Sequence, residues 1–227
     1  MKFGDLAGPN AHRRGPALAG LAGAAFLAVA VLGATCADRS TGDGEEGGAP
    51  PVGDTGAGAL DAATLVARYA APVEGEPGSV AHYEDLGAYH RAIATSSPEA
   101  GEYFDQGLRL QYAFNHAEAI RAYEEALRYD PECAMCWWGI ALASGNNINA
   151  PMDPESGRRA YAAAQRALEL ADDASSGERA LIEALTRRYG LDPEAERAAL
   201  DSAYARAMGG AAESHPEDGD VLAPHRA

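Results

Sequence analysis

The chain has 227 residues, is rich in alanine, glycine and arginine, and carries a formal net charge of -16 with a single lysine, Lys2. Such an acidic chain repels nucleic acid and anionic lipid head groups, so we expect its partners among proteins, basic peptides and small ligands. Its three cysteines are too few for a disulfide scaffold, and the composition favours helices joined by flexible segments.

Residues 1–36 have the pattern of an export signal. Positive charges near the start precede residues 17–32, which are all apolar or small, and residues 32–36 then resemble the site at which bacterial lipoproteins are cleaved. We therefore expect a signal peptide, lipidation of Cys36, and a periplasmic or membrane-anchored lipoprotein that contacts the membrane only through its N-terminus. Ordinary signal-peptidase cleavage nearby and an uncleaved anchor are the alternatives.

A linker and an approach segment follow the predicted signal. Residues 37–59 are largely glycine, proline and acidic residues, which cannot bury enough apolar surface to fold, so they predict a disordered linker. Residues 60–96 predict a partly ordered approach segment, because 60–70 can form an amphipathic helix that residues 75–78 interrupt with two glycines.

Capping chemistry marks five helix starts in the region 97–227. Four of them combine an oxygen-bearing cap, a proline and a glutamate, an arrangement that satisfies the free N–H groups of a first turn and suits the helix dipole. The fifth is a capping box formed by Ser175 and Glu178. The four proline-containing starts have their caps at Ser97, Asp130, Asp153 and Asp192.

Small and aromatic residues recur at helical spacing after the first of these starts. The small residues let two helices approach closely, and an aromatic residue fills the angle between them. Their order resembles one tetratricopeptide repeat of about 34 residues. The residues that carry the resemblance are Tyr103, Gly107, Ala119, Tyr123, Ala126 and Pro131.

Two further units continue the pattern. One opens at Trp137 and has an insertion in its loop, 145–156, and residues 177–216 resemble a degenerate third unit. The resemblance implies an all-α fold, a short right-handed α-solenoid of helix-turn-helix hairpins over residues 97–227.

The stretch from Tyr103 to Met152 resembles, more narrowly, a group of exported bacterial tetratricopeptide proteins without an established activity. The resemblance implies a non-catalytic scaffold of the cell envelope that binds a protein or peptide and needs no cofactor. Members of the group are longer, so we expect this chain to be truncated at its C-terminus. A non-functional fragment of a longer protein is therefore an alternative.

In this repeat family the first helix of each hairpin lines a binding groove. The positions that match are Asp105, Leu108, Gln111, Tyr112, Trp138 and Leu142. Aromatic residues beside polar groups suit an extended peptide or a partner helix. Phe104 also falls on this face, but packing against a neighbouring unit is the favoured interpretation for it, whereas for Trp138 both interpretations stay open.

The inserted loop carries three asparagines, Asn146, Asn147 and Asn149. Insertions in solenoids often carry function, whereas asparagine also simply suits turns, so both interpretations stay open. The adjacent acids Glu124 and Glu125 do not share one helix face and are interpreted as solvated surface.

Cys133 and Cys136 form the sharpest chemical pattern in the chain. They lie three residues apart at a predicted helix start, where thiol pKa values fall, and with His116 they define the alternative hypothesis of a metal-binding or redox-active protein. The pattern lacks the second cysteine pair of a structural zinc site, so buried cysteines, with or without a local disulfide, are the simpler interpretation. The sequence shows no nucleophile triad or phosphate-binding loop, and we expect no enzyme.

Overall fold

A computed structural model describes residues 60–147, 151–193 and 195–222. The predicted signal peptide, Cys36, the linker and Asn149 lie outside the described residues. Regular structure within these ranges is helical throughout, in agreement with the predicted all-α class. The elements are α1 (Ala62–Tyr69), α2 (Pro98–Tyr112), α3 (His116–Tyr129), α4 (Ala134–Ser144), α5 (Pro154–Glu169), the 3-10 helix η1 (Ala171–Asp173), α6 (Ser176–Thr186), α7 (Arg197–Ser214) and α8 (Gly219–Leu222).

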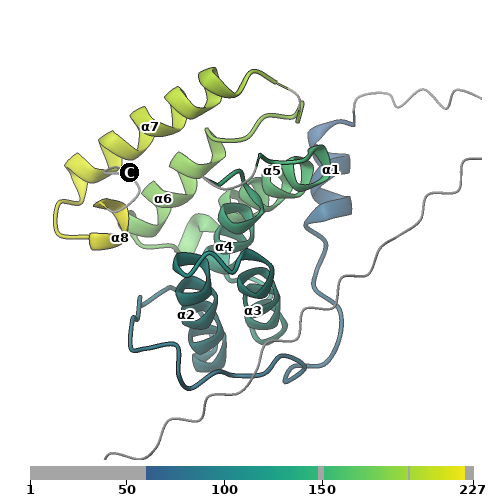
Figure 1. Ribbon diagram of the computed structural model, residues 1–227, viewed down its shortest axis with the longest axis vertical. Coiled ribbons are helices and arrows are strands. Elements are labelled where there is room, and N and C mark those ends of the chain that lie inside the picture. Colours follow the sequence, from purple (N-terminus) through teal and green to yellow (C-terminus); the bar gives the residue numbers. More distant parts are fainter. Residues whose placement is uncertain (1–59, 148–150, 194, 223–227) are drawn as a thin grey trace, which may run out of the picture. The chain divides into compact units, whose positions relative to one another are not determined.

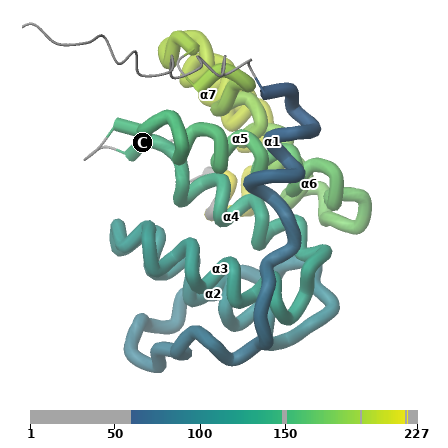
Figure 2. Tube along the Cα trace, turned by 90° about the vertical axis from the view of Figure 1, so that its right-hand side faces the viewer, coloured from purple at the N-terminus to yellow at the C-terminus, as the bar shows by residue number. Residues whose placement is uncertain are grey.

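Consecutive helices pack as hairpins, α2 with α3, α4 with α5 and α6 with α7, and α3 also packs against α4 (Figure 1). The predicted packing of consecutive helices as hairpins is therefore confirmed, whereas membership of a repeat family stays a prediction. Helix α1 packs against α5, where Leu65 is buried and the Tyr69 hydroxyl donates to Glu155 Oε2 at 3.0 Å (Figure 2). None of the described helices is long and apolar enough to span a membrane.

Three of the five predicted helix starts are confirmed. The Ser97 hydroxyl accepts from the N–H of Ala100, and the Asp153 carboxylate accepts from two N–H groups of α5. Ser175 and Glu178 form the full capping box at the start of α6.

The two starts predicted at Asp130 and Asp192 are wrong by several residues. Helix α4 begins at Ala134, with Cys133 as its cap; one Asp130 oxygen accepts locally from the N–H of Glu132 at 3.3 Å, and the other is bonded to Thr95 and Ser96, which precede α2. Helix α7 begins at Arg197, because the N–H of Ala195 closes a turn onto the carbonyl of Asp192.

The core is centred on the ring of Tyr123, which is fully buried between α2, α3 and α4. A Cβ atom at Gly107 of α2 would lie 2.5 Å from this ring, and one at Gly139 of α4 would lie 2.6 Å from it. The predicted close approach of small and aromatic residues is therefore confirmed, and Gly139 is a second contact that the repeat pattern did not indicate. Two glycines leave the space that one tyrosine fills.

The Tyr123 hydroxyl is buried without a hydrogen-bond partner among the described residues. Because an unsatisfied buried hydroxyl opposes folding, we expect Tyr123→Phe to leave the free energy of unfolding unchanged or to raise it by up to about 1 kcal/mol. The matched control is Tyr103→Phe, whose hydroxyl donates to the carbonyl of Val80 at 2.8 Å and whose loss is expected to cost about 1 kcal/mol. Urea unfolding measures both, and a cost for Tyr123→Phe equal to the control would contradict the expectation.

Candidate binding face and its strap

A segment without regular secondary structure, residues 78–96, passes over the helical hairpins before α2 begins (Figure 2). We call it the strap. Its first limb, 78–83, follows α2 and α3; its tip, 84–88, is largely exposed; and its second limb, 89–96, returns past α2 toward α6. Two of the six predicted groove residues contact the strap, Asp105 through hydrogen bonds and Tyr112 through its ring contact with Tyr89.

The first limb is held by Glu125 of α3. Its carboxylate accepts from the backbone N–H of Gly78, from the Ser79 hydroxyl at 2.8 Å and from the Arg128 guanidinium at 2.8 Å. Burial by itself would raise the pKa of Glu125, but these hydrogen bonds and the charge of Arg128 outweigh it, so the pKa lies below its usual 4.5. The interpretation of Glu125 as solvated surface was wrong, because its side chain is fully buried beneath the strap.

Gln106 of α2 bonds the same limb in both directions. Its Nε2 donates to the carbonyl of Ala81 at 2.9 Å, and its Oε1 accepts from the N–H of Tyr83 at 2.8 Å. One side-chain amide thus satisfies a donor and an acceptor of the strap backbone, much as a neighbouring strand would do. Val80, which lies between the residues bonded by Glu125 and those bonded by Gln106, is the buried apolar residue of the limb.

The second limb is held by Asp105 and Arg109, also from α2. Asp105 accepts from the N–H of Arg91 at 3.0 Å and lies 2.5 Å from His90 Nδ1, and Arg109 Nε donates to the carbonyl of Tyr89 at 2.6 Å. The same helix therefore holds both limbs.

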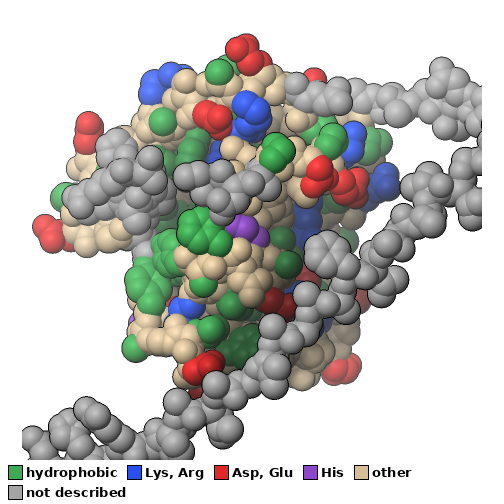
Figure 3. Space-filling view, in the orientation of Figure 1, with side chains coloured by type: hydrophobic (Ala, Val, Ile, Leu, Met, Phe, Trp, Pro, Cys, Tyr) green, Lys and Arg blue, Asp and Glu red, His purple; other side chains and the backbone are tan. Residues whose placement is uncertain are grey.

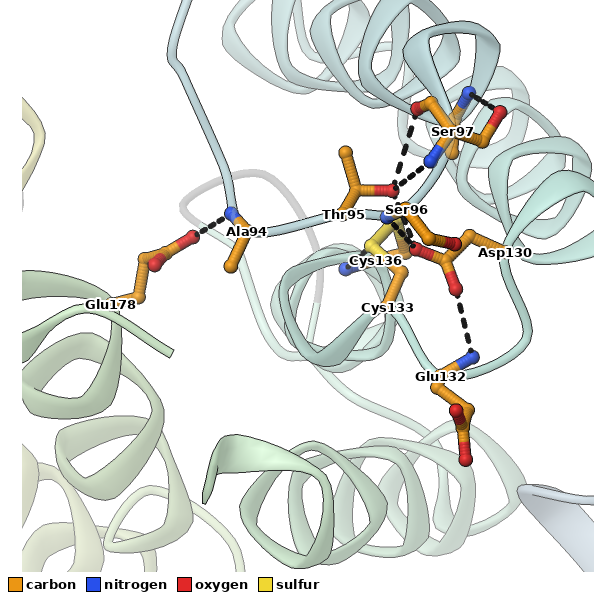
Figure 4. The surroundings of a disulfide bond; sticks show 10 residues. Ala94, Thr95, Ser96, Ser97, Asp130, Glu132, Cys133, Cys136 and Glu178 are labelled. Carbon is orange, nitrogen blue, oxygen red and sulfur yellow. Dashed lines mark hydrogen bonds between the residues drawn. A yellow bond between two sulfur atoms is a disulfide. The ribbon is translucent and has the colours of Figure 1, made fainter. Parts of the chain in front are cut away.

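The end of the limb is bonded by Glu178 and Asp130 (Figure 4). Glu178, at the start of α6, accepts from the N–H of Ala94 at 2.7 Å. Asp130, between α3 and α4, accepts from the N–H of Ser96 at 2.8 Å and from the Thr95 hydroxyl at 2.5 Å. These contacts bring the start of the third hairpin and the turn between the first two hairpins to one backbone segment.

The described residues contain six buried polar or charged side chains, and five of them bond the strap. Buried polar groups need such partners, since an unsatisfied one is costly. Most of the bonds go to main-chain N–H and C=O groups, so this face recognises the backbone of a non-helical segment. The five are Asp105, Gln106, Glu125, Asp130 and Glu178.

An open cleft of about 540 Å³ lies where the strap ends. It is bounded by the strap, the turn before α4, the end of α5 with η1, and the start of α6. Two of its carboxylates have arginine neighbours outside the lining, Arg166 at 3.0 Å from Glu169 and Arg179 at 3.9 Å from Asp172. The cleft stays strongly acidic, because its charged lining residues are Asp130, Glu132, Glu169, Asp172, Asp173 and Glu178.

Cys133 and Cys136 are joined by a disulfide in the first turn of α4, with their Cα atoms 5.3 Å apart, and both are buried. His116 lies at the opposite end of α3, roughly 20 Å away by the rise of a helix, and its Nδ1 is 3.1 Å from Gln111 Oε1. The structure therefore does not bring the three residues of the metal or redox hypothesis together. No group of three or more potential metal ligands is found in the described ranges.

The predicted groove residues differ in their accessibility. Asp105, Leu108 and Trp138 are buried, Gln111 and Leu142 are half-buried, and Tyr112 is 47% exposed. Asp105 holds the strap, as described above.

Trp138 Nε1 donates to the carbonyl of Leu181 in α6 at 3.2 Å, and the Phe104 ring lies 5.7 Å from that of Tyr123. Trp138 thus contacts a neighbouring hairpin, as the packing interpretation predicts, whereas Phe104 is buried against Tyr123 within its own hairpin. In the inserted loop, the carbonyl of Asn146 accepts from Arg188 at 2.8 Å, which ties the loop to the end of α6.

Aromatic side chains surround the turn between α2 and α3. Phe114 is 60% exposed and has a φ of 60°, which is unusual for a bulky residue. Tyr112 and Tyr89 meet edge to face beside it, with ring centroids 5.5 Å apart. Hydrophobic side chains are exposed over α2 in the space-filling view (Figure 3).

Comparisons of the chain with protein-family models, with curated proteins and with solved structures found no match. The fold and the site therefore define a class only: an all-α protein of sequential hairpins whose buried polar side chains hold a non-helical segment.

Proposed function

We propose that the protein is a non-catalytic scaffold that binds a segment of a partner protein. The supporting observation is that five buried polar side chains from α2, α3, α6 and the turn before α4 hold a non-helical backbone. A face with this hydrogen-bonding chemistry suits peptide recognition, in which main-chain bonds give affinity. The cleft beside it is open space that such a segment can enter.

Charge indicates which segments suit the cleft. Its charged lining residues are all acidic, and the whole chain carries -16, so a lysine- or arginine-rich segment is favoured over an acidic one. We place this role in the bacterial cell envelope, on the export pattern of residues 1–36. The Cys133–Cys136 disulfide supports an oxidising compartment.

A short fluorescent peptide of alternating lysine and alanine tests this proposal, with a glutamate–alanine peptide as its counterpart. Glu169→Gln, Asp172→Asn and Asp173→Asn combined are expected to weaken binding of the lysine peptide about tenfold, since each exposed ion pair contributes up to about 1 kcal/mol. Fluorescence anisotropy with the full chain measures the dissociation constants.

The matched control removes the same charge from exposed acids away from the cleft, through Glu102→Gln, Glu183→Gln and Glu213→Gln. It is expected to change the affinity less than about twofold, because distant exposed charges are screened by salt. Equal weakening by both triple variants would show diffuse attraction rather than a site. No binding of the lysine peptide by the wild type would exclude a basic partner at this cleft.

A further inference from the structure

The strap is held mainly by polar bonds and buries little apolar surface. Val80 is its buried apolar side chain, Leu86 and Ile93 are half-buried, and most of the remaining residues are exposed. Gly78 and Gly87 have positive φ values, and a Cβ at either would meet no atom within 4 Å. Segments with few buried apolar contacts open locally at much lower free energy than the core, so the strap can leave its face while the helices stay folded.

Many of the bonds that hold the strap go to its main chain, while the side chains of Ser79, His90, Arg91 and Thr95 bond Glu125, Asp105, Asp218 and Asp130. The face accepts from the N–H groups of Gly78, Tyr83, Arg91, Ala94 and Ser96 and donates to the carbonyls of Val80, Ala81 and Tyr89. Every residue except proline offers both kinds of group. Another chain with a small aliphatic residue at the position of Val80 can therefore make the same main-chain bonds, without the side-chain bonds of the strap.

We infer that the strap is an internal occupant of the partner-binding face and that a segment of a partner protein binds there by displacing it. This inference rests on the proposed function and adds its regulation. The partner segment is non-helical, carries an aliphatic side chain at the position of Val80 and has no proline where the face accepts an N–H group. Its basic residues extend into the acidic cleft next to Ser96.

The strap is favoured over any such partner segment because both of its ends are attached to the folded helices. Helix α1 on α5 anchors the chain before it, and the Ser97 cap of α2 begins directly after it. A tether at both ends keeps the strap at high effective concentration, so it excludes weak ligands and lowers the apparent affinity of strong ones. Partner binding and strap release are then one coupled equilibrium.

The test uses the strap itself as the probe, as a fluorescent synthetic peptide of residues 78–96. In the full chain, Tyr83→Pro with Ala94→Pro removes two N–H donors of the strap and leaves Gln106 and Glu178 in place. The variant is expected to bind the peptide at least about tenfold more tightly than the wild type, because each lost hydrogen bond favours strap opening by several-fold. A peptide carrying the same two prolines is expected to bind neither chain.

Ala88→Pro at the exposed tip is the matched control, and it is expected to leave peptide binding as in the wild type. Equal affinity of the wild type and the double variant, or absence of binding to both, would overturn the inference. The lysine–alanine peptide distinguishes the inference from the proposed function. If this peptide binds the cleft while the strap peptide binds neither chain, the inference that a partner displaces the strap is wrong and the proposed function stands.

Hydrogen exchange of the unmodified chain gives a second test that needs no variant. The amides of Tyr83, Arg91 and Ala94 are expected to exchange at least about a hundredfold faster than the buried amides of α4, because local opening exposes them. Protection equal to that of α4 would overturn the inference, since the strap would then open only when the whole fold unfolds.

Discussion

Alanine at Gly107 or at Gly139 is expected to lower the free energy of unfolding by about 3 kcal/mol, a large part of the stability of an ordinary domain. The new Cβ would lie 2.5 Å from the Tyr123 ring in the first variant and 2.6 Å from it in the second. That ring is fully buried between the two glycines, so it cannot move aside without displacing α2 or α4. Overpacking at Gly107 separates α2 from α3 within the first hairpin, and overpacking at Gly139 separates the first hairpin from the second.

The control for this prediction is alanine at two helical glycines with room for a side chain. At Gly101 of α2 the nearest atom to a Cβ is Thr95 Cγ2 at 3.9 Å, and at Gly210 of α7 no atom lies within 4 Å. These changes are expected to raise the free energy of unfolding by about 0.5–1 kcal/mol, because alanine is the better helix former. Urea unfolding followed by circular dichroism measures all four variants. Similar values for Gly107→Ala and Gly101→Ala would contradict the tight seam at Tyr123.

Removing the Glu125 carboxylate is expected to have the second-largest effect. Glu125→Ala leaves the N–H of Gly78, the hydroxyl of Ser79 and the guanidinium of Arg128 without this shared acceptor. We expect a loss of about 2–4 kcal/mol, as is typical when one member of a buried, hydrogen-bonded charge pair is removed. Hydrogen exchange of the Val80 and Ala81 amides should accelerate in the same variant, because the first limb is then held chiefly by Gln106.

The Glu125 carboxylate also predicts how stability changes with acid. Its pKa is lower in the folded chain than the usual 4.5, so its contribution is complete above pH 4.5 and is lost as the pH falls through the lowered value. Thermal unfolding across this range is expected to show a steeper loss for the wild type than for Glu125→Gln, which cannot titrate there. Parallel curves for the two chains would show that this carboxylate does not favour the folded state.

The elements that could be predicted from the sequence are those set by local chemistry. Ser97, Asp153 and Ser175 cap helices through side-chain bonds that span at most three residues, so the sequence signal was sufficient. Asp130 has the same signal and does not start a helix at the predicted place. Its carboxylate is bonded to Thr95 and Ser96, which are 35 and 34 residues away.

The candidate site was only partly predictable for the same reason. Helical spacing placed Tyr103, Gly107 and Tyr123 correctly at the seam, because close helix packing requires that pattern. The burial of Glu125 depends on Gly78 and Ser79, which are 47 and 46 residues away, and no spacing along the chain shows this contact. The strap likewise contacts the face of α2 that helix register predicted to line an open groove.

The most direct test of the partner-binding role is a titration of the full, ¹⁵N-labelled chain with the lysine–alanine peptide, followed by two-dimensional NMR. Saturable shifts confined to amides that line the cleft, such as those of Glu132, Asp172 and Asp173, are the predicted result. Shifts that fail to saturate, or that spread evenly over the acidic surface, would contradict a binding site at the end of the strap.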